Sequence, residues 1–187
     1  MGMKKFIKSK EFLSQIPSWE KNYKKDDTLQ IAYDKSDWRT APAVFSDHDL
    51  TILGEAVMED WETPYMRELA SIATSRGGTI LEVGFGMGIS ANFIQQADID
   101  RHIIIEANQD VAAKARNFAA RALHKTEVIE GMWEDVIGCI PHETINGILF
   151  DSYPLCEEEL YQNHFAFFPY AYSKLTGGGY SHTTLMK

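Results

Sequence analysis

The sequence predicts an α/β fold with a doubly wound, mostly parallel sheet, and two observations lead to this prediction. Short apolar, β-branched runs alternate with segments of helical periodicity, which is the pattern of parallel strands connected by helices. The first of these runs ends in closely spaced glycines, where a strand of such a sheet turns tightly into the next helix. With 187 residues, of which 44% are hydrophobic, the chain can bury one substantial core but hardly two. We therefore expect one compact domain.

The first helix of this alternation is predicted to begin at Thr63. Thr63 can cap the helix, and Pro64 stands in the first turn, where a helix tolerates proline. The apolar residues that follow recur at helical spacing and form one face: Met66, Leu69, Ala70 and Ala73. Gly77 and Gly78 then end the helix.

Beyond residue 78 the alternation continues along the sequence. Strands are predicted at 79–83, 102–106, 126–130 and 145–151, with helices at 89–96, 109–123 and, as a short turn, after residue 132. The acidic run at 157–159 suits the start of a further helix, because the N-terminus of a helix is positive. The glycines at 177–179 then lead into a fifth strand near 180–184.

The first 50 residues precede this alternation and are charged and aromatic by turns. The run KNYKKDD at 21–27 predicts a solvated break between two short helices. We interpret residues 1–50 as an N-terminal extension and candidate active-site lid, and residues 51–187 as the domain that carries the activity.

The composition argues against several classes of function. A formal charge of −9 and a pI near 5.1 do not suit a surface that neutralises phosphates, so we expect small-molecule partners and no nucleic acid. No run of about 18 apolar residues is present to span a bilayer, and the basic N-terminus lacks the apolar stretch of a secretion signal. The histidines and the two cysteines do not follow metal-ligand spacing. We expect a cytoplasmic protein with no membrane association and no metal.

The segment LEVGFGMG is the main candidate for a cofactor-binding loop. Gly84, Gly86 and Gly88 stand at the carboxyl end of the first predicted strand, where an open α/β sheet binds its ligand. Ile89 stands where the dinucleotide fingerprint G-x-G-x-x-G has its last glycine. Glu82 suits the cationic aminoacyl end of a sulfonium cofactor better than a pyrophosphate, which it would repel. The loop therefore favours a sulfonium cofactor over NAD, although glycines after a strand can also form a plain tight turn.

Glu106 stands at the tip of the second predicted strand. From this position a carboxylate can accept hydrogen bonds from both hydroxyls of a ribose. Because sites for NAD and for S-adenosylmethionine share this acid, Glu106 supports a nucleoside ligand without choosing between them.

From about residue 51 to 178, the sequence resembles the guanidinoacetate N-methyltransferases. Five separated segments follow the order of that family: VMEDWETPYM, GGTILEVGFGMGIS, IIIEAN, GMWEDV and GILFDSYPL. The resemblance implies a class I, Rossmann-like methyltransferase fold with S-adenosylmethionine as methyl donor and S-adenosylhomocysteine as product. It also implies that the acceptor is guanidinoacetate and that the product is creatine.

The resemblance implies roles for individual residues as well. The family's cofactor contacts correspond to Trp38, Met58, Met66, Phe85, Gly86, Met87, Gly88, Ile89, Ser90, Glu106, Trp133 and Glu134. Of these, Glu106 would bind the ribose, and Trp133 and Glu134 the adenine side. Trp38, in KSDWRTAP, resembles the tryptophan that closes over the family's site. Helical spacing alone would make Met58 and Met66 ordinary core residues.

Glu62, in DWETPY, and Asp151, in FDSYP, resemble the two carboxylates that hold the guanidino group in this family. A guanidinium has a pKa of about 12 or more and is a poor nucleophile, so a site must hold it and remove a proton. Two carboxylates can form paired, charge-assisted hydrogen bonds to its nitrogens. We expect Asp151 to accept the proton, Glu62 to orient the group and Tyr153 to be a further substrate contact. Without the resemblance, Asp151 could equally cap a turn, Glu62 be a solvated acid and Tyr153 a packing residue.

Three other functions are alternatives. The acceptor could be arginine or another guanidino or amino metabolite, because these motifs do not identify the residues that bind the far end of the substrate. The chain could bind the cofactor as a noncatalytic interaction module, which its intact carboxylates argue against. An NAD-dependent dehydrogenase is disfavoured by the glycine spacing.

The C-terminal part of the sequence departs from the family pattern. Class I methyltransferases continue past the fifth strand with a helix and an antiparallel strand pair, for which the sequence up to Lys187 has no room. We therefore expect a sheet short of its C-terminal strands, with an apolar edge that favours pairing or aggregation, and a candidate homodimer. For such a chain alone we expect cofactor binding with weak or no turnover.

Overall fold

The computed structural model describes residues 33–155, 159–177 and 183–185, which belong to a unit that begins at Ile31. The predicted break at 21–27 lies outside the described residues, as does most of the acidic run at 157–159. Of the fifth strand, predicted near 180–184, only the end falls within them.

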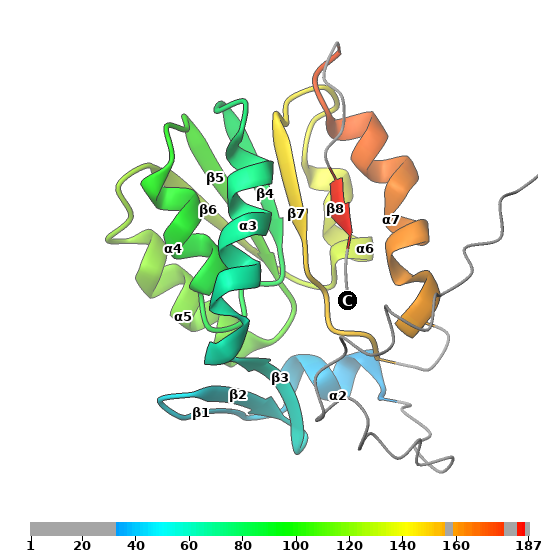
Figure 1. Ribbon diagram of the computed structural model, residues 1–187. Helices are drawn as coiled ribbons and strands as arrows, with labels where there is room; N and C mark the ends of the chain where they lie inside the picture. The colour runs from blue at the N-terminus through cyan, green and yellow to red at the C-terminus, as the bar shows by residue number, and fades with distance from the viewer. Residues whose placement is uncertain (1–32, 156–158, 178–182, 186–187) are drawn as a thin grey trace, which may run out of the picture. The chain divides into compact units, whose positions relative to one another are not determined.

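Five parallel strands form the central sheet (Figure 1). The strands are β4 (Thr79–Val83), β5 (Arg101–Glu106), β6 (Lys125–Glu130), β7 (Gly147–Phe150) and β8 (Thr183–Leu185). Their order across the sheet is β6-β5-β4-β7-β8, so the chain starts in the centre, winds to one edge and then returns to the other. This topology confirms the predicted doubly wound, Rossmann-like sheet.

Helices cover both faces of this sheet (Figure 1). One face packs against α3 (Thr63–Thr74), α4 (Ile89–Gln96) and α5 (Gln109–Ala119), and the other against α6 (Trp133–Val136) and α7 (Glu159–Lys174). Two 3-10 helices, η2 (Asp60–Glu62) and η3 (Ile137–Cys139), precede α3 and follow α6. The central sheet and the helices on its two faces therefore form three layers.

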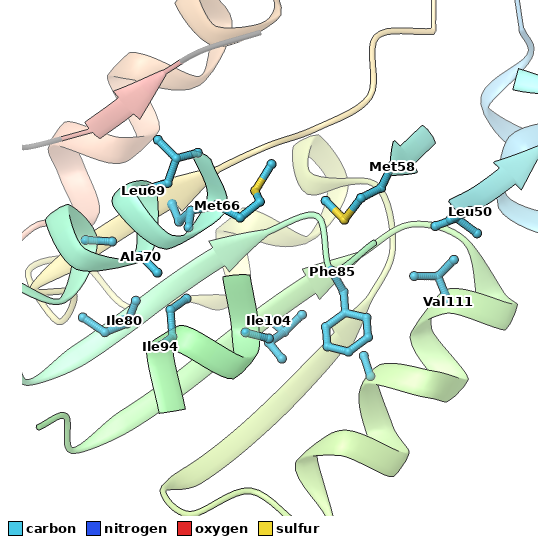
Figure 2. Close-up of a cluster of buried hydrophobic side chains, with 14 of the residues drawn as sticks. Leu50, Met58, Met66, Leu69, Ala70, Ile80, Phe85, Ile94, Ile104 and Val111 are labelled. Atoms are coloured by element: carbon cyan, nitrogen blue, oxygen red, sulfur yellow. The ribbon is translucent and has the colours of Figure 1, made fainter. Parts of the chain in front are cut away.

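Alternation along the central strands divides the apolar side chains between two cores. Ile80 and Ile104 point into the core beneath α3, α4 and α5, which Figure 2 shows. Leu81 and Ile103 point to the opposite face, toward α6 and α7. Because both faces are covered, the inner strands read as nearly continuous apolar runs in the sequence.

The helix bounds agree with the predicted ones except at one end. α3 begins at Thr63, and the four residues of its predicted apolar face are its buried residues. α5 begins at Gln109 but ends at Ala119, four residues before the predicted end at 123. Leu123 is 82% exposed, so no burial in the last predicted turn stabilises a longer helix.

The sequence did not predict the structure between residues 35 and 59. The short helix α2 (Lys35–Thr40) precedes a small antiparallel sheet of β1 (Ala43–Phe45), β2 (Asp49–Ile52) and β3 (Glu55–Glu59). Leu53 and Gly54 join β2 to β3 with φ of 54° and 86°, as a type I′ hairpin turn requires. The boundary predicted after residue 50 falls inside β2. Strands of three to five residues are too short to show a clear alternation of apolar and polar positions.

Gly147, at the start of β7, passes so close to α3 that a side chain there should be costly. A Cβ atom at this position would lie 1.8 Å from the carbonyl oxygen of Ala73. We expect Gly147→Ala to lower the free energy of unfolding by about 3 kcal/mol, because backbone atoms on both sides must shift. Gly138→Ala is the matched control, since a Cβ there meets nothing within 4 Å. Urea unfolding measures both variants, and equal midpoints would contradict the prediction.

Candidate active site

The small antiparallel sheet and α2 face the carboxyl ends of the parallel strands (Figure 1). Residues from these elements line a cleft at this edge of the central sheet. It encloses about 620 Å³, counting the solvent at its mouth. Predicted site residues that line it are Trp38, Met58, Gly84, Gly86, Glu106, Trp133, Asp151 and Tyr153. The fold thus brings together residues that are separated by more than a hundred positions in the sequence.

The glycine loop, residues 84–88, connects β4 to α4 along one wall of the cleft. Gly84 and Gly86 have φ of +90° and +53°, which glycine adopts without strain. A Cβ atom on Gly84 would lie 2.2 Å from the carbonyl oxygen of Asp151, and one on Gly86 would lie 2.8 Å from the sulfur of Met58. The Met87 N–H donates a hydrogen bond to the same sulfur, with 3.3 Å between N and S. Close packing against backbone therefore requires glycine at position 84, and the positive φ favours glycine at position 86.

Glu106 joins this loop to the start of α5. The Phe85 N–H donates to its Oε2 and the Asn108 N–H to its Oε1, each at 2.8 Å. Burial raises the pKa of Glu106, while backbone N–H groups around the carboxylate act in the opposite direction. An ionised carboxylate at this position is an acceptor-only group on the cleft wall, as a ribose requires.

Residues 35–41 place Trp38 on the lining of the cleft, and we use the name lid for this part of the lid predicted at 1–50. The Trp38 ring stacks on Tyr153, with 4.9 Å between ring centroids and an angle of 11° between the planes. Asn108 binds the lid, because its side-chain amide donates hydrogen bonds to the carbonyl oxygens of Trp38 and Ala41 at 2.9 and 2.8 Å. In the sequence, Asn108 stands directly before a predicted helix. This position predicts a helix cap, but not hydrogen bonds to residues that lie far earlier in the sequence.

Both predicted substrate carboxylates act electrostatically on Tyr65. Burial raises the pKa of Tyr65 to about 12, and the charges of Asp151 and Glu62 add to the effect. Asp151 lines the cleft at the end of β7, whereas Glu62 is buried and accepts a hydrogen bond from the Glu59 N–H at 3.0 Å. Tyr65 was not among the predicted site residues, because an aromatic residue on the apolar side of a helix is indistinguishable from core in the sequence.

Sequence reasoning also missed the apolar part of the cleft. The small sheet contributes Leu50, Ile52 and Val57 to its lining, and the central sheet and α5 contribute Val83, Ile105 and Val111. Each of these residues looks like ordinary core in the sequence, and only the proximity of the two sheets turns them into cleft walls.

Several predicted site residues do not line the cleft. Met66 lies in the core beneath α3, and Glu134 binds Lys35 of the lid at 2.7 Å. Glu82 is fully buried behind the glycine loop and accepts a hydrogen bond from Ser90. Others outside the lining are Phe85, Met87, Gly88 and Ile89. Their contacts with a cofactor stay predictions.

The chain is similar to known proteins over most of its length. A family model described as guanidinoacetate N-methyltransferase matches residues 30–185. The chain belongs to this family. The match extends the resemblance that the five sequence segments indicated, and it includes both the lid and the small antiparallel sheet.

Curated relatives of this guanidinoacetate N-methyltransferase family member match over about half of the chain. The chain is 36% identical over 108 residues to protein arginine N-methyltransferase 2 of Saccharomyces cerevisiae. This alignment covers 53% of the chain and 26% of the relative. The protein of the same name from Candida glabrata is 34% identical over 106 residues, with the same coverage. The chain thus spans about a quarter of the length of these relatives.

Solved structures share the fold of this family member. An O-methyltransferase from Bacillus cereus in complex with SAH aligns with a TM-score of 0.51 and 23% identity over 66% of the chain and 56% of that structure. Spermidine synthase from Thermotoga maritima aligns with a TM-score of 0.55 and 15% identity over 75% of the chain and 55% of that structure. The chain therefore spans just over half of each.

Two other findings concern metal binding and membrane-spanning helices. The described residues contain no group of three or more His, Cys, Asp or Glu side chains arranged to hold a metal. None of the helices in the described ranges combines the length and the apolar character needed to cross a bilayer.

Replacing Asn108 by aspartate separates its two structural roles. Asn108→Asp keeps an oxygen that accepts from the Asp110 and Val111 N–H groups at the start of α5, but it cannot donate to the lid. Losing such donors costs about 1–3 kcal/mol, so we expect amide hydrogen exchange in the lid to accelerate at least about fivefold. Exchange in the rest of α5 should stay unchanged. Asn117→Asp, on the exposed side of α5, is the control, and equal lid exchange in both variants would contradict the assignment.

Proposed function

We propose that the chain is an S-adenosylmethionine-dependent N-methyltransferase that converts guanidinoacetate to creatine. The observation that carries the proposal is that Asp151 lines the same cleft as Glu106 and the glycine loop, and that Asp151 and Glu62 both act electrostatically on Tyr65. Membership of the guanidinoacetate N-methyltransferase family supports this acceptor in particular.

The residues of the cleft fit a nucleoside with a sulfonium group. Gly86 leaves room for close approach to the loop, Glu106 can accept from the ribose hydroxyls, and Ile105 and Val111 offer an apolar surface to adenine. Glu82 lies behind the loop, from where its negative charge attracts a cationic aminoacyl end without touching it. When bound, S-adenosylmethionine supplies a methyl group that its sulfonium charge has already activated.

The two carboxylates explain the choice of a guanidinium as acceptor. Asp151 and Glu62 can form charge-assisted hydrogen bonds to its nitrogens, which draw positive charge away from the attacking one. Asp151 would accept the N–H proton that this nitrogen releases on methylation, for which bound S-adenosylmethionine would supply the methyl group and leave as S-adenosylhomocysteine. Tyr65 stays protonated at neutral pH and can donate to these carboxylates without competing for the proton. Holding the acceptor in line with the methyl group supplies a further part of the acceleration.

Methylation of arginine, free or within a protein, is the second candidate function. The curated relatives that match half of the chain are named protein arginine N-methyltransferase 2. Arginine and guanidinoacetate share the guanidino group, so the same two carboxylates suit both.

A homodimer, the absence of nucleic-acid partners and a cytoplasmic location stay predictions.

Calorimetric titration and a methyl-transfer screen together test the function. We expect S-adenosylhomocysteine to bind, and methyl transfer from radiolabelled S-adenosylmethionine to be fastest with guanidinoacetate. Free arginine and an arginine-containing peptide serve as the competing acceptors. No binding of S-adenosylhomocysteine would refute the methyltransferase proposal, and faster transfer to the peptide would replace guanidinoacetate by protein arginine.

Asp151→Asn tests the proton acceptor. The amide keeps the shape of the side chain but cannot take up a proton, so we expect turnover to fall at least about 100-fold. Affinity for S-adenosylhomocysteine should change little, because the acceptor and not the cofactor loses a contact. Asp100→Asn makes the same change in charge before β5, at the opposite edge of the sheet, and should leave turnover unchanged. Full activity of Asp151→Asn would show that another group accepts the proton.

The raised pKa of Glu106 predicts how cofactor affinity depends on pH. The carboxylate must be ionised to accept from both ribose hydroxyls, so affinity should fall as pH decreases through the raised pKa, at higher pH than for an exposed glutamate. Folding stability should change in the opposite sense, since ionising this buried group costs more in the folded chain than in the unfolded chain. We expect Glu106→Gln to bind S-adenosylhomocysteine about tenfold more weakly at neutral pH and to lose this pH dependence. Calorimetry over a pH series tests this, with the exposed Glu68→Gln as control.

A further inference from the structure

A chain of buried polar side chains runs behind the glycine loop, through a core that is otherwise apolar. The Ser90 hydroxyl, in the first turn of α4, donates to Oε1 of Glu82 on β4. Oε2 of Glu82 lies 3.0 Å from Nε2 of His102 on β5. On the far side of the ring, Nδ1 of His102 lies 3.2 Å from the amide nitrogen of Gln95 on α4. All four residues are buried, and each is at most 5% exposed.

The backbone determines the direction of these hydrogen bonds. The His124 N–H can only donate, and it bonds to Oε1 of Gln95 at 2.8 Å, which turns the Gln95 amide nitrogen toward His102. The Thr126 hydroxyl donates to the His124 carbonyl oxygen at 2.9 Å and accepts from Gln95 at 3.0 Å. Because the Gln95 nitrogen can only donate, Nδ1 of His102 must accept. In the neutral ring the proton therefore lies on Nε2, facing Glu82.

The contact between His102 and Glu82 is the incomplete part of this chain. Nε2 and Oε2 are 3.0 Å apart but lack the alignment of a hydrogen bond, and neither atom has another partner among the described residues. A buried donor and a buried acceptor left in this state are costly. The two atoms are nevertheless within hydrogen-bonding distance, and the same carboxylate accepts a hydrogen bond from Ser90.

The position of Ser90 and Glu82 connects this chain to the cofactor site. Glu82 precedes the glycine loop and Ser90 follows it, so their hydrogen bond joins the two ends of the loop. Gly84 and Gly86 lie between those ends and line the cleft. A group that orients Glu82 therefore acts on the shape of the loop.

We propose that His102 is a positioning residue for cofactor binding. Held in one tautomer by Gln95, it orients Glu82 and, through Ser90, the glycine loop. His102 does not line the cleft, so it acts only through Glu82. This inference rests on the proposed function, because it concerns the affinity of the same cleft for S-adenosylmethionine.

Titration of the full chain with S-adenosylhomocysteine tests the inference. We expect His102→Leu, which removes the donor, to bind about tenfold more weakly than the wild type. His102→Gln restores an N–H donor at a similar distance from the backbone, and we expect its affinity to lie within about threefold of the wild type. Ile104→Val is the matched control, since Ile104 is buried in the same core and pairs with Glu82 in the sheet register. Thermal unfolding identifies any loss of affinity that follows from reduced stability alone.

A double-mutant cycle tests the path through Glu82. Ser90 and His102 share Glu82 as their partner, so Ser90→Ala should weaken binding in the wild type but add little in the His102→Leu background. Additive losses in the two variants, or equal affinity of His102→Leu and Ile104→Val, would overturn the proposal.

Nitrogen NMR of the histidine rings gives a readout that does not depend on the cofactor. We expect His102 to carry its proton on Nε2 in the wild type, and Gln95→Leu to remove this preference. A proton on Nδ1 in the wild type would overturn the proposal. If the wild type binds S-adenosylhomocysteine and His102→Leu binds equally well, only this inference fails. If the wild type does not bind it, the proposed function fails first and the inference with it.

Discussion

The hydrogen bonds to Glu106 connect the parts on which the candidate site depends. One oxygen of this carboxylate accepts from Phe85 in the glycine loop, and the other accepts from Asn108 at the start of α5. Asn108 in turn holds the lid over the cleft through the carbonyl oxygens of Trp38 and Ala41. A single buried carboxylate thus links the end of β4, the end of β5 and a segment that lies far earlier in the chain. This linkage explains why a group whose burial is unfavourable is retained at that position.

Four carboxyl groups lie around the cleft, and three of them are in or near the core. Glu62, Glu82 and Glu106 are all buried, and each accepts at least one hydrogen bond from a nearby backbone or side-chain donor. Asp151 adds a further carboxylate to the lining. Charges in such surroundings are screened less than those on the surface, so they act strongly on a ligand. The proposed cofactor and the proposed acceptor are both cationic at their reacting ends, which agrees with this electrostatic character.

The parallel topology explains why the site lies where it does. Every strand of the central sheet ends at the same edge, so the residues that follow β4, β5 and β7 meet there. The small antiparallel sheet and the lid then cover this edge and give it apolar walls. Stacking of Trp38 on Tyr153 extends the cover to the side on which Asp151 lies.

The sequence by itself determined the α/β class, the central strands and most helix bounds, because strand and helix periodicity and the glycine loop are local signals. It indicated the family through the resemblance of five separated segments. It also predicted Glu106, Asp151 and Glu62 as site residues, although the last two depended on the resemblance to a known family. Only the tertiary structure decided that Glu82 lies behind the loop with Ser90 and His102, and that Asn108 holds the lid. These contacts join residues on different strands and helices, and the direction of a side chain in space is not encoded by its neighbours in sequence. The small antiparallel sheet was missed for the same reason, since its short strands are stabilised by what they cover and not by their own periodicity.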